Sequence, residues 1–182
     1  TGRRLAALAG DLATENDANR LRAAGIPSQS ITTGSTCHLD ADLVHRSMHH
    51  VDLSAVDYLF IENVGNLVCP AVYDLGQAFN VVALAVTEGE DKPLKYPVMF
   101  HKADLVLITK ADLVPHLEID VDTIKANLAR VMPEPLALVV SARTGQGIDL
   151  WAEWLEHQKR HHVPSGVAAH HAHPHPHGHA HP

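Results

Sequence analysis

The hydrophobic pattern divides the chain into short apolar runs separated by amphipathic stretches. Four runs, at residues 56–63, 81–87, 104–109 and 136–141, are dense in Val, Leu and Ile and lack strict alternation with polar residues. Continuous runs of this kind are typical of strands buried on both faces of a parallel sheet. The stretches between them supply helical crossover connections. The pattern therefore predicts an α/β fold, doubly wound around a mostly parallel sheet.

Polar clusters follow nearly every apolar run. They occupy residues 10–11, 62–66, 109–112 and 141–145. In parallel α/β sheets, ligands bind at the carboxyl ends of the strands. The sequence therefore predicts a ligand-binding rim at one end of the sheet.

The segment that begins at Thr109 indicates recognition of guanine. The Asp112 carboxylate can accept hydrogen bonds from N1–H and the exocyclic amine of the base, while the aliphatic stem of Lys110 covers the ring. Ser141 and Ala142, at the end of the next run, could offer a backbone N–H to the guanine carbonyl. Most nucleotide switches of this type have Asn where this chain has Thr109, and a plain turn is the alternative interpretation.

A carboxylate followed three residues later by glycine, as in Glu62 and Gly65, can hold Mg²⁺ and offer a backbone N–H to a terminal phosphate. Both residue types are also common in ordinary turns. The phosphate-cradling string G-x-x-x-x-G-K-[ST] does not occur in the 182 residues, which begin at Thr1 without an initiator Met. We therefore expect the remainder of a longer protein, cut after its phosphate loop.

Three residues with soft ligand atoms flank the Glu62 segment. Cys37 and His38 precede a predicted helix, and Cys69 follows the glycine. Thiolate and imidazole suit Zn²⁺ and Ni²⁺, and three ligands leave a coordination position open. The alternative is that the cysteines are small buried hydrophobes and that His38 caps the helix.

The C-terminal residues have a different composition. We predict a globular unit over residues 1–160 and a disordered tail over 164–182, where His alternates with Pro, Gly and Ala. Flexible imidazoles can wrap a divalent cation, with affinity rising toward Ni²⁺ and Cu²⁺. A purification tag or a low-complexity accident are the competing interpretations. The seven candidate ligands are His170, His171, His173, His175, His177, His179 and His181.

Composition narrows the function classes. The formal charge of −7, from 14 basic and 21 acidic residues, argues against nucleic-acid binding. No apolar stretch is long enough for a membrane span, and two cysteines are too few for a disulfide framework, so we expect a cytoplasmic protein. The remaining histidines, His157 and His161 among them, are interpreted as exposed helix residues.

Several longer segments resemble one family. They are GDLATENDANRLRAAGIP, TTGSTCHLDADLV, FIENVGNLVCPAVYDLG, VTEGEDKPLKYPVMF, ITKADLVPHL and SARTGQG. Together they resemble the hydrogenase nickel-incorporation GTPases, the HypB family of P-loop GTPases, over residues 3 to about 158. The strings ENVGNLVCP and EGEDKPLKYP separate this family from the urease accessory GTPase, which carries a Cys-Pro-His motif instead.

The resemblance implies roles for individual residues. Asp11 matches the carboxylate of the first switch, which is placed to act on Mg²⁺ or the attacking water, and Glu62 with Gly65 matches the second switch. The guanine pocket is implied for Lys110, Asp112, Ser141 and Ala142. A metal site shared across a nucleotide-linked dimer is implied for Cys37, His38 and Cys69, and a dimer contact for Lys95, Leu113 and Leu117.

The implied function is that of a GTP-dependent nickel metallochaperone for [NiFe] hydrogenase. Its ligands would be GTP, Mg²⁺ and Ni²⁺ or Zn²⁺. Its partners would be a second copy of itself, a partner nickel metallochaperone and the hydrogenase large subunit. Without a phosphate loop, we expect the chain itself not to hydrolyse GTP. The alternative is a non-enzymatic nickel or zinc storage protein that acts through its histidine tail.

Overall fold

The computed structural model describes residues 2–11, 15–34 and 36–162. The strands are β1 (Leu5–Asp11), β2 (Ser28–Thr32), β3 (Tyr58–Glu62), β4 (Val81–Ala85), β5 (Leu105–Thr109) and β6 (Ala137–Val139). The α-helices are α1 (Asn16–Ala23), α2 (Ala41–Met48), α3 (Lys92–Lys95), α4 (Pro97–His101), α5 (Val121–Val131) and α6 (Ile148–His161). Three short 3₁₀ helices complete the fold: η1 (Cys69–Val72), η2 (Val86–Glu88) and η3 (Ala111–His116).

The strands form two parallel three-stranded sheets, in the orders β2-β1-β3 and β4-β5-β6. The four apolar runs became β3, β4, β5 and β6, so the prediction of a parallel α/β fold is confirmed. The hydrophobic pattern did not place β1 and β2 among the predicted buried strands. β1 is rich in alanine and β2 in serine, so neither has the dense Val, Leu and Ile content of the other runs.

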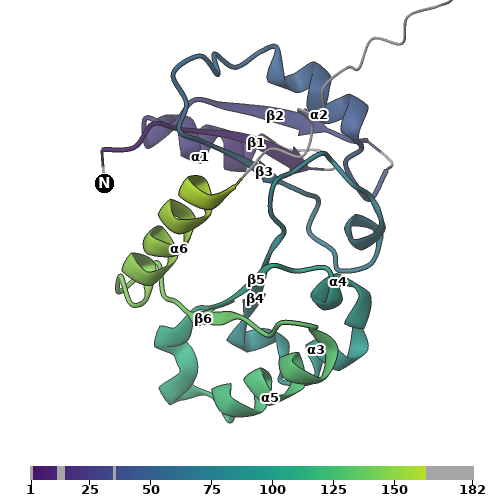
Figure 1. Ribbon diagram of the computed structural model, residues 1–182, viewed down its shortest axis with the longest axis vertical. Coiled ribbons are helices and arrows are strands. Elements are labelled where there is room, and N and C mark those ends of the chain that lie inside the picture. Colours follow the sequence, from purple (N-terminus) through teal and green to yellow (C-terminus); the bar gives the residue numbers. More distant parts are fainter. Residues whose placement is uncertain (1, 12–14, 35, 163–182) are drawn as a thin grey trace, which may run out of the picture.

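Within the described chain, β3 has β1 as its only strand neighbour, and β4 has only β5. The two sheets are therefore not joined by main-chain hydrogen bonds. In Figure 1 they lie in the upper and lower halves of the molecule. Each has its own apolar core, one around Leu8 and Leu39 and the other around Phe100 and Ile108.

Helix α6 connects the two halves (Figure 1). Trp151 lies 6.0 Å from Phe60 of β3, measured between ring centroids, and also packs on the cluster formed by Leu105, Leu107 and Val140. Two ion pairs add to the attachment: Arg3 with Glu156 at 2.6 Å and Lys159 with Asp57 at 2.7 Å. The aromatic contacts and ion pairs therefore hold α6 against both sheets.

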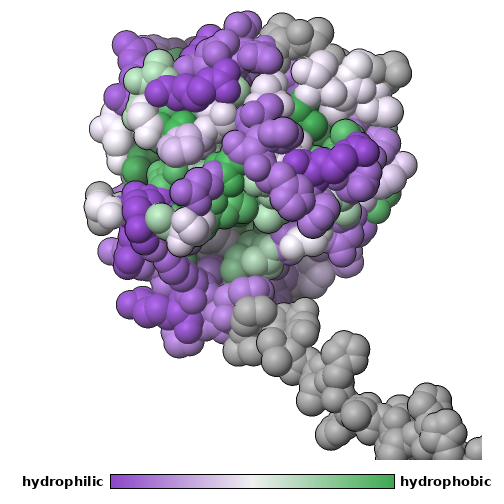
Figure 2. Space-filling model, turned by 90° about the horizontal axis from the view of Figure 1, so that it is seen from above, coloured by the Kyte–Doolittle hydropathy of each residue, from purple (hydrophilic) through white to green (hydrophobic). Residues whose placement is uncertain are grey.

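The molecular surface is mainly hydrophilic, with apolar side chains grouped near the middle of the face shown in Figure 2. Exposed apolar residues include Val68 and Val72, each 61% exposed, on either side of Cys69. Among the described helices, none is both long and apolar enough to cross a bilayer.

Candidate nucleotide and metal site

The predicted guanine pocket is assembled from two loops that meet beyond the ends of β5 and β6. The Ala111 N–H donates to the Val140 carbonyl oxygen over 3.1 Å, which fixes one loop against the other. The Ser141 hydroxyl, fully buried, donates to Asp112 Oδ1 over 2.6 Å. This hydrogen bond, with Arg143 3.9 Å from the other oxygen, holds the pKa of the Asp112 carboxyl below its ordinary value. Asp112 is therefore an ionised acceptor with a fixed orientation.

Lys110 has an unusual backbone conformation. Its φ of 59° and ψ of 37° place it in the left-handed region, the only non-glycine residue among those described with a positive φ. For an L-residue this conformation costs roughly 1–2 kcal/mol, because Cβ approaches the carbonyl oxygen. Strain of this kind concentrates at ligand-binding sites. The conformation turns the chain sharply between Thr109, which ends β5, and Asp112.

Two carboxylates lie at the ends of neighbouring strands. Asp11 ends β1 and Glu62 ends β3, and the register pairs Ala9 with Glu62. Partial loss of hydration raises the pKa of the Glu62 carboxyl, and the negative charges of Asp17 and Asp11 raise it further. Mutual repulsion of this kind is relieved when a cation binds between carboxylates, so these oxygens fit Mg²⁺.

Close approach of the backbone at Gly10 contributes to this arrangement. A Cβ at Gly10 would lie 2.9 Å from the Glu62 carbonyl oxygen and 3.0 Å from the Leu39 side chain. Glycine therefore allows β1 to carry Asp11 close to Glu62. Gly65 is different, because a Cβ there would have no neighbour within 4 Å.

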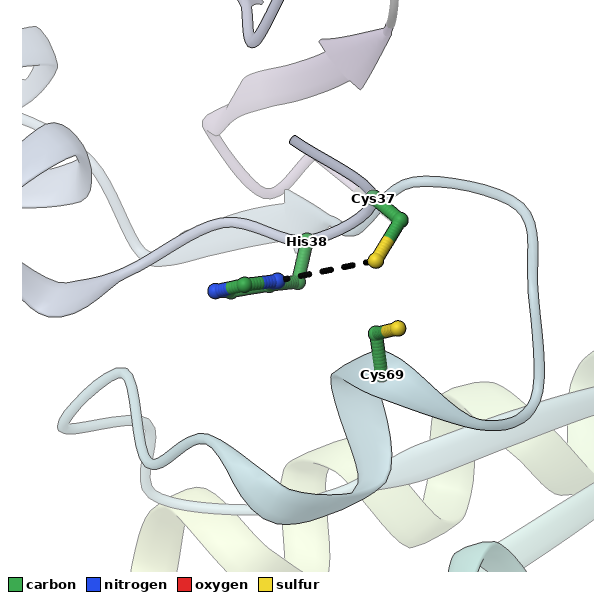
Figure 3. Close-up of side chains that lie close together, drawn as sticks. All are labelled: Cys37, His38 and Cys69. Atoms are coloured by element: carbon green, nitrogen blue, oxygen red, sulfur yellow. Dashed lines mark hydrogen bonds between the residues drawn. The ribbon is translucent and has the colours of Figure 1, made fainter. Parts of the chain in front are cut away.

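Cys37, His38 and Cys69 converge on one point (Figure 3). Their ligand atoms all lie within 4.8 Å of one another, and Cys37 Sγ is 3.8 Å from His38 Nδ1. Cys37 is exposed and Cys69 half-buried, which excludes the interpretation of both as buried hydrophobes. The alternative role for His38 is also wrong, since Asp40 caps α2 by accepting from the Leu43 N–H.

The neighbouring Cys37 thiol raises the pKa of the Cys69 thiol, with loss of hydration as a second cause. A cation that binds both sulfur atoms stabilises the thiolates and displaces their protons. The donor set of two thiolates and one imidazole suits a borderline metal such as Ni²⁺ or Zn²⁺. The arrangement can therefore bind a metal with a position left for a further ligand.

Two asparagines connect these ligands to the loop after β3. Asn66 Nδ2 donates to the Cys37 carbonyl oxygen over 2.6 Å, and Asn66 Oδ1 accepts from the Cys69 N–H over 2.9 Å. Asn63 Oδ1 accepts from the Leu39 N–H over 3.0 Å and from its own neighbour Val64 over 2.8 Å. The loop that begins at Glu62 is thus hydrogen-bonded to both metal-ligand segments.

Sequence analysis did not assign Asn63, Asn66 or Tyr73 to the site. Asn66 accepts from the Val68 and Cys69 N–H groups, a local turn that an asparagine two or three residues before them can indicate, whereas its contact with Cys37 has no local signal. The Tyr73 ring stacks on His38 with centroids 3.7 Å apart and planes 11° apart. No sequence spacing predicts that contact, because it depends on how η1 folds back over residue 38.

The remaining predicted residues are dispersed. Lys95 pairs with Asp91 at 2.7 Å on the surface, Leu113 packs partly buried against the second core, and Leu117 is 37% exposed. Ala142 is exposed next to buried Ser141. The seven tail histidines, residues 170–181, lie outside the described residues.

The fold and these two clusters define a parallel α/β domain with a candidate nucleotide pocket and a cluster of cysteine and histidine side chains that could hold a metal ion. In agreement, residues 1–137 match the family model of the CobW/HypB/UreG nucleotide-binding domain, and the chain belongs to this family.

Two curated relatives are similar over most of this chain. The hydrogenase maturation factor HypB of Azotobacter vinelandii is 53% identical over 160 residues, which cover 87% of this chain and 53% of the relative. The hydrogenase/urease maturation factor HypB of Helicobacter pylori (strain 26695) is 41% identical over 160 residues, 86% of this chain and 66% of the relative. The chain thus spans about half the length of the first of these relatives.

One solved structure adds a comparison of the fold. The crystal structure of HypB from Helicobacter pylori in complex with nickel matches with a TM-score of 0.85 and 38% identity. The match covers 92% of this chain and 80% of that one.

Proposed function

We propose that this chain is the greater part of the GTPase domain of a nickel metallochaperone that serves maturation of [NiFe] hydrogenase. The observation that carries the proposal is the hydrogen-bonded link between the loop after Glu62 and the cluster of Cys37, His38 and Cys69. A protein that only stored metal would not need its ligands attached to a nucleotide-responsive loop.

In this proposal the Asp112 carboxylate accepts the N–H groups of guanine, oriented by Ser141. The Ser141 backbone N–H already donates to the Gln146 carbonyl oxygen over 2.9 Å, so the donor to the guanine carbonyl is the Ala142 N–H. The Lys110 stem covers one face of the base. Thr109 replaces the usual asparagine without disturbing the Asp112 contact.

Asp11 and Glu62 would hold Mg²⁺, which neutralises charge on the phosphates when bound. Gly65 would offer its N–H to the terminal phosphate. The phosphate-cradling string G-x-x-x-x-G-K-[ST] does not occur in the 182 residues, which cover 53% of the Azotobacter vinelandii relative. One further parallel strand between the free edges of β3 and β4 would join the two sheets and bring such a loop beside Glu62.

Movement of residues 62–65 between nucleotide states would move Asn63 and Asn66, and through them the segments that carry Cys37 and Cys69. Nickel affinity then depends on the bound nucleotide, and nickel must change nucleotide affinity by the same factor. GTP hydrolysis would thereby time the release of the metal to its acceptor.

The proposed partners are a second copy, a partner nickel metallochaperone and the hydrogenase large subunit, all in the cytoplasm. Lys95, Leu113 and Leu117 would contribute to the contact between copies. The tail histidines would store nickel. The name of the Helicobacter pylori relative includes both hydrogenase and urease. The motifs that separate this family from urease accessory GTPases therefore do not by themselves exclude a role in urease maturation.

The test is a nickel titration followed by thiolate-to-metal charge-transfer absorption. In the 182-residue chain this signal reports the cysteine site alone, because the chain has two cysteines and residues 164–182 have none, and the Cys37→Ala variant isolates the same contribution in a longer form. In a longer form that includes the phosphate loop, a non-hydrolysable GTP analogue and GDP should give nickel affinities that differ at least about fivefold. Equal affinities in both states would contradict the proposal.

The storage alternative gives a different result in the same titration. Nickel would bind through histidines with little thiolate absorption, and the Cys37→Ala variant would retain the whole metal capacity. Under the metallochaperone proposal, Cys37→Ala removes the thiolate signal while the tail continues to bind nickel.

A further inference from the structure

Two histidines interpreted from sequence as ordinary surface residues form a close pair on α6. The imidazole rings of His157 and His161 have centroids 4.5 Å apart, and their planes are inclined by 39°. Both side chains are exposed. Residues four apart lie on the same helix face, one turn above the other.

This spacing and separation suit a shared cation. Two histidines four residues apart on a helix are the arrangement by which a metalloprotease helix binds zinc. A metal about 2.1 Å from one nitrogen of each ring, with the nitrogens near 90–110° apart, places the centroids about 5 Å apart. The observed separation therefore requires only small side-chain rotations to bind an ion.

The surroundings of the pair favour a positive ion. His161 is the last residue of α6, where the helix dipole stabilises cations. Glu153 lies one turn before His157 on the same face and adds negative charge. Of the neighbouring cations, Lys159 is paired with Asp57 at 2.7 Å, and Arg160 is exposed and directly precedes His161.

A second histidine pair provides a comparison. His45 and His49 have ring centroids 5.0 Å apart and planes 83° apart. His49 has helical backbone angles, with φ of −67° and ψ of −15°, but it lies one position past Met48, the last residue of α2, whereas His157 and His161 both lie within α6. The α6 pair is the better organised of the two.

We propose that His157 and His161 form a second metal site, a bidentate site for a borderline divalent cation such as Ni²⁺, separate from the cysteine site. Imidazole ligands select Ni²⁺, Cu²⁺ and Zn²⁺ over Mg²⁺ and Ca²⁺. With two protein ligands, the other coordination positions remain available to water or to an incoming ligand. With fewer protein ligands and no thiolate, the site holds an ion more weakly and exchanges it faster than the Cys37, His38 and Cys69 cluster.

The test is hydrogen exchange of residues 155–162 in the full chain, measured by mass spectrometry with increasing Ni²⁺. A metal that bridges one helical turn restrains the end of α6, so its amides should exchange several-fold more slowly with metal. The variants His157→Gln and His161→Gln should each abolish this slowing. His162→Gln is the matched control, since His162 packs against Phe79 with centroids 5.2 Å apart and lies outside α6.

The readout is local, so nickel bound elsewhere in the chain does not obscure it. Both altered side chains are exposed, and metal-free exchange rates report directly whether α6 is intact in each variant. Equal slowing in His157→Gln and the parent, or no slowing at any nickel concentration, overturns the proposal. The Cys37→Ala variant should keep the α6 protection, which makes this result independent of the proposed metallochaperone function.

Discussion

Asn66 donates a hydrogen bond from its side-chain amide to the backbone carbonyl of Cys37 over 2.6 Å, although the two residues are 29 positions apart. The same side chain accepts from the Cys69 N–H at 2.9 Å. One carboxamide therefore sets the distance between the two thiol-bearing segments. It does so without being a ligand, and its position in the loop after Glu62 connects that distance to the loop that we propose to respond to nucleotide.

Replacing Asn66 by Ala should weaken metal binding at the cysteine site by about 10–100-fold, the usual effect of removing a group that orients metal ligands. The measurement is the thiolate-to-metal absorption during a nickel titration. Asn19→Ala is the control, because Asn19 lies on α1 and, among the described contacts, its side chain accepts a hydrogen bond only from Arg22. Unchanged nickel affinity in Asn66→Ala would show that the ligands are organised without this side chain.

Replacing Lys110 by Gly should raise the free energy of unfolding by about 0.5–1 kcal/mol, since glycine adopts a positive φ without the Cβ penalty. The same change should weaken guanine-nucleotide binding, because the stem over the base is lost. Lys102→Gly, at an ordinary φ of −91°, should instead lower stability. If the left-handed conformation is strained, urea unfolding will show changes in the free energy of unfolding of opposite sign in the two variants. If it is not strained, both variants will lose stability to a similar extent.

Replacing Gly147 by Ala should be strongly destabilising. Gly147 has φ of 68° at the start of α6, and a Cβ there would lie 2.3 Å from the Val139 carbonyl oxygen. Backbone must shift to admit it, at a cost of about 3 kcal/mol or more. Gly25→Ala, with φ of 79° and open space around the new Cβ, should cost only about 1 kcal/mol. Thermal unfolding of both variants distinguishes the cost of the steric contact, present only at residue 147, from the cost of a positive φ, present at both positions.

The ion pair between Asp57 and Lys159 should make stability depend on acid pH. Hydrogen bonds from Lys159 and from the Arg4 N–H lower the pKa of Asp57 from 3.8 to about 2. A carboxyl with a depressed folded-state pKa contributes stability above its unfolded-state pKa. That contribution is lost as the pH falls from about 4 to about 2. The difference in urea midpoint between the parent and Asp57→Asn should therefore shrink across this window, and a constant difference would refute the assignment.

The sequence alone was sufficient to predict the strands β3, β4, β5 and β6, because a strand buried on both faces of a parallel sheet shows as a continuous run of large apolar residues. The sequence alone was also sufficient to predict the family, since the strings ENVGNLVCP and EGEDKPLKYP are specific to it. Strands β1 and β2 were harder to recognise. Three of the four buried positions of β1 are alanines, with Leu8 the fourth, and small residues give little hydrophobic signal.

The sequence suggested Cys37, His38 and Cys69 as metal ligands only as a hypothesis. The tertiary structure decided that their ligand atoms lie within 4.8 Å of one another. Residues far apart in the chain come together only through the packing of the elements that carry them, so neither the Asn66 bridge nor the stacking of Tyr73 on His38 has a local signature. The local motif at Lys110 to Asp112 could be read from the chain, because strand, turn and acceptor are consecutive there. The hydrogen bond from buried Ser141 to Asp112 could not be predicted in this way, because the two residues are 29 positions apart, and the left-handed backbone of Lys110 has no glycine to indicate it.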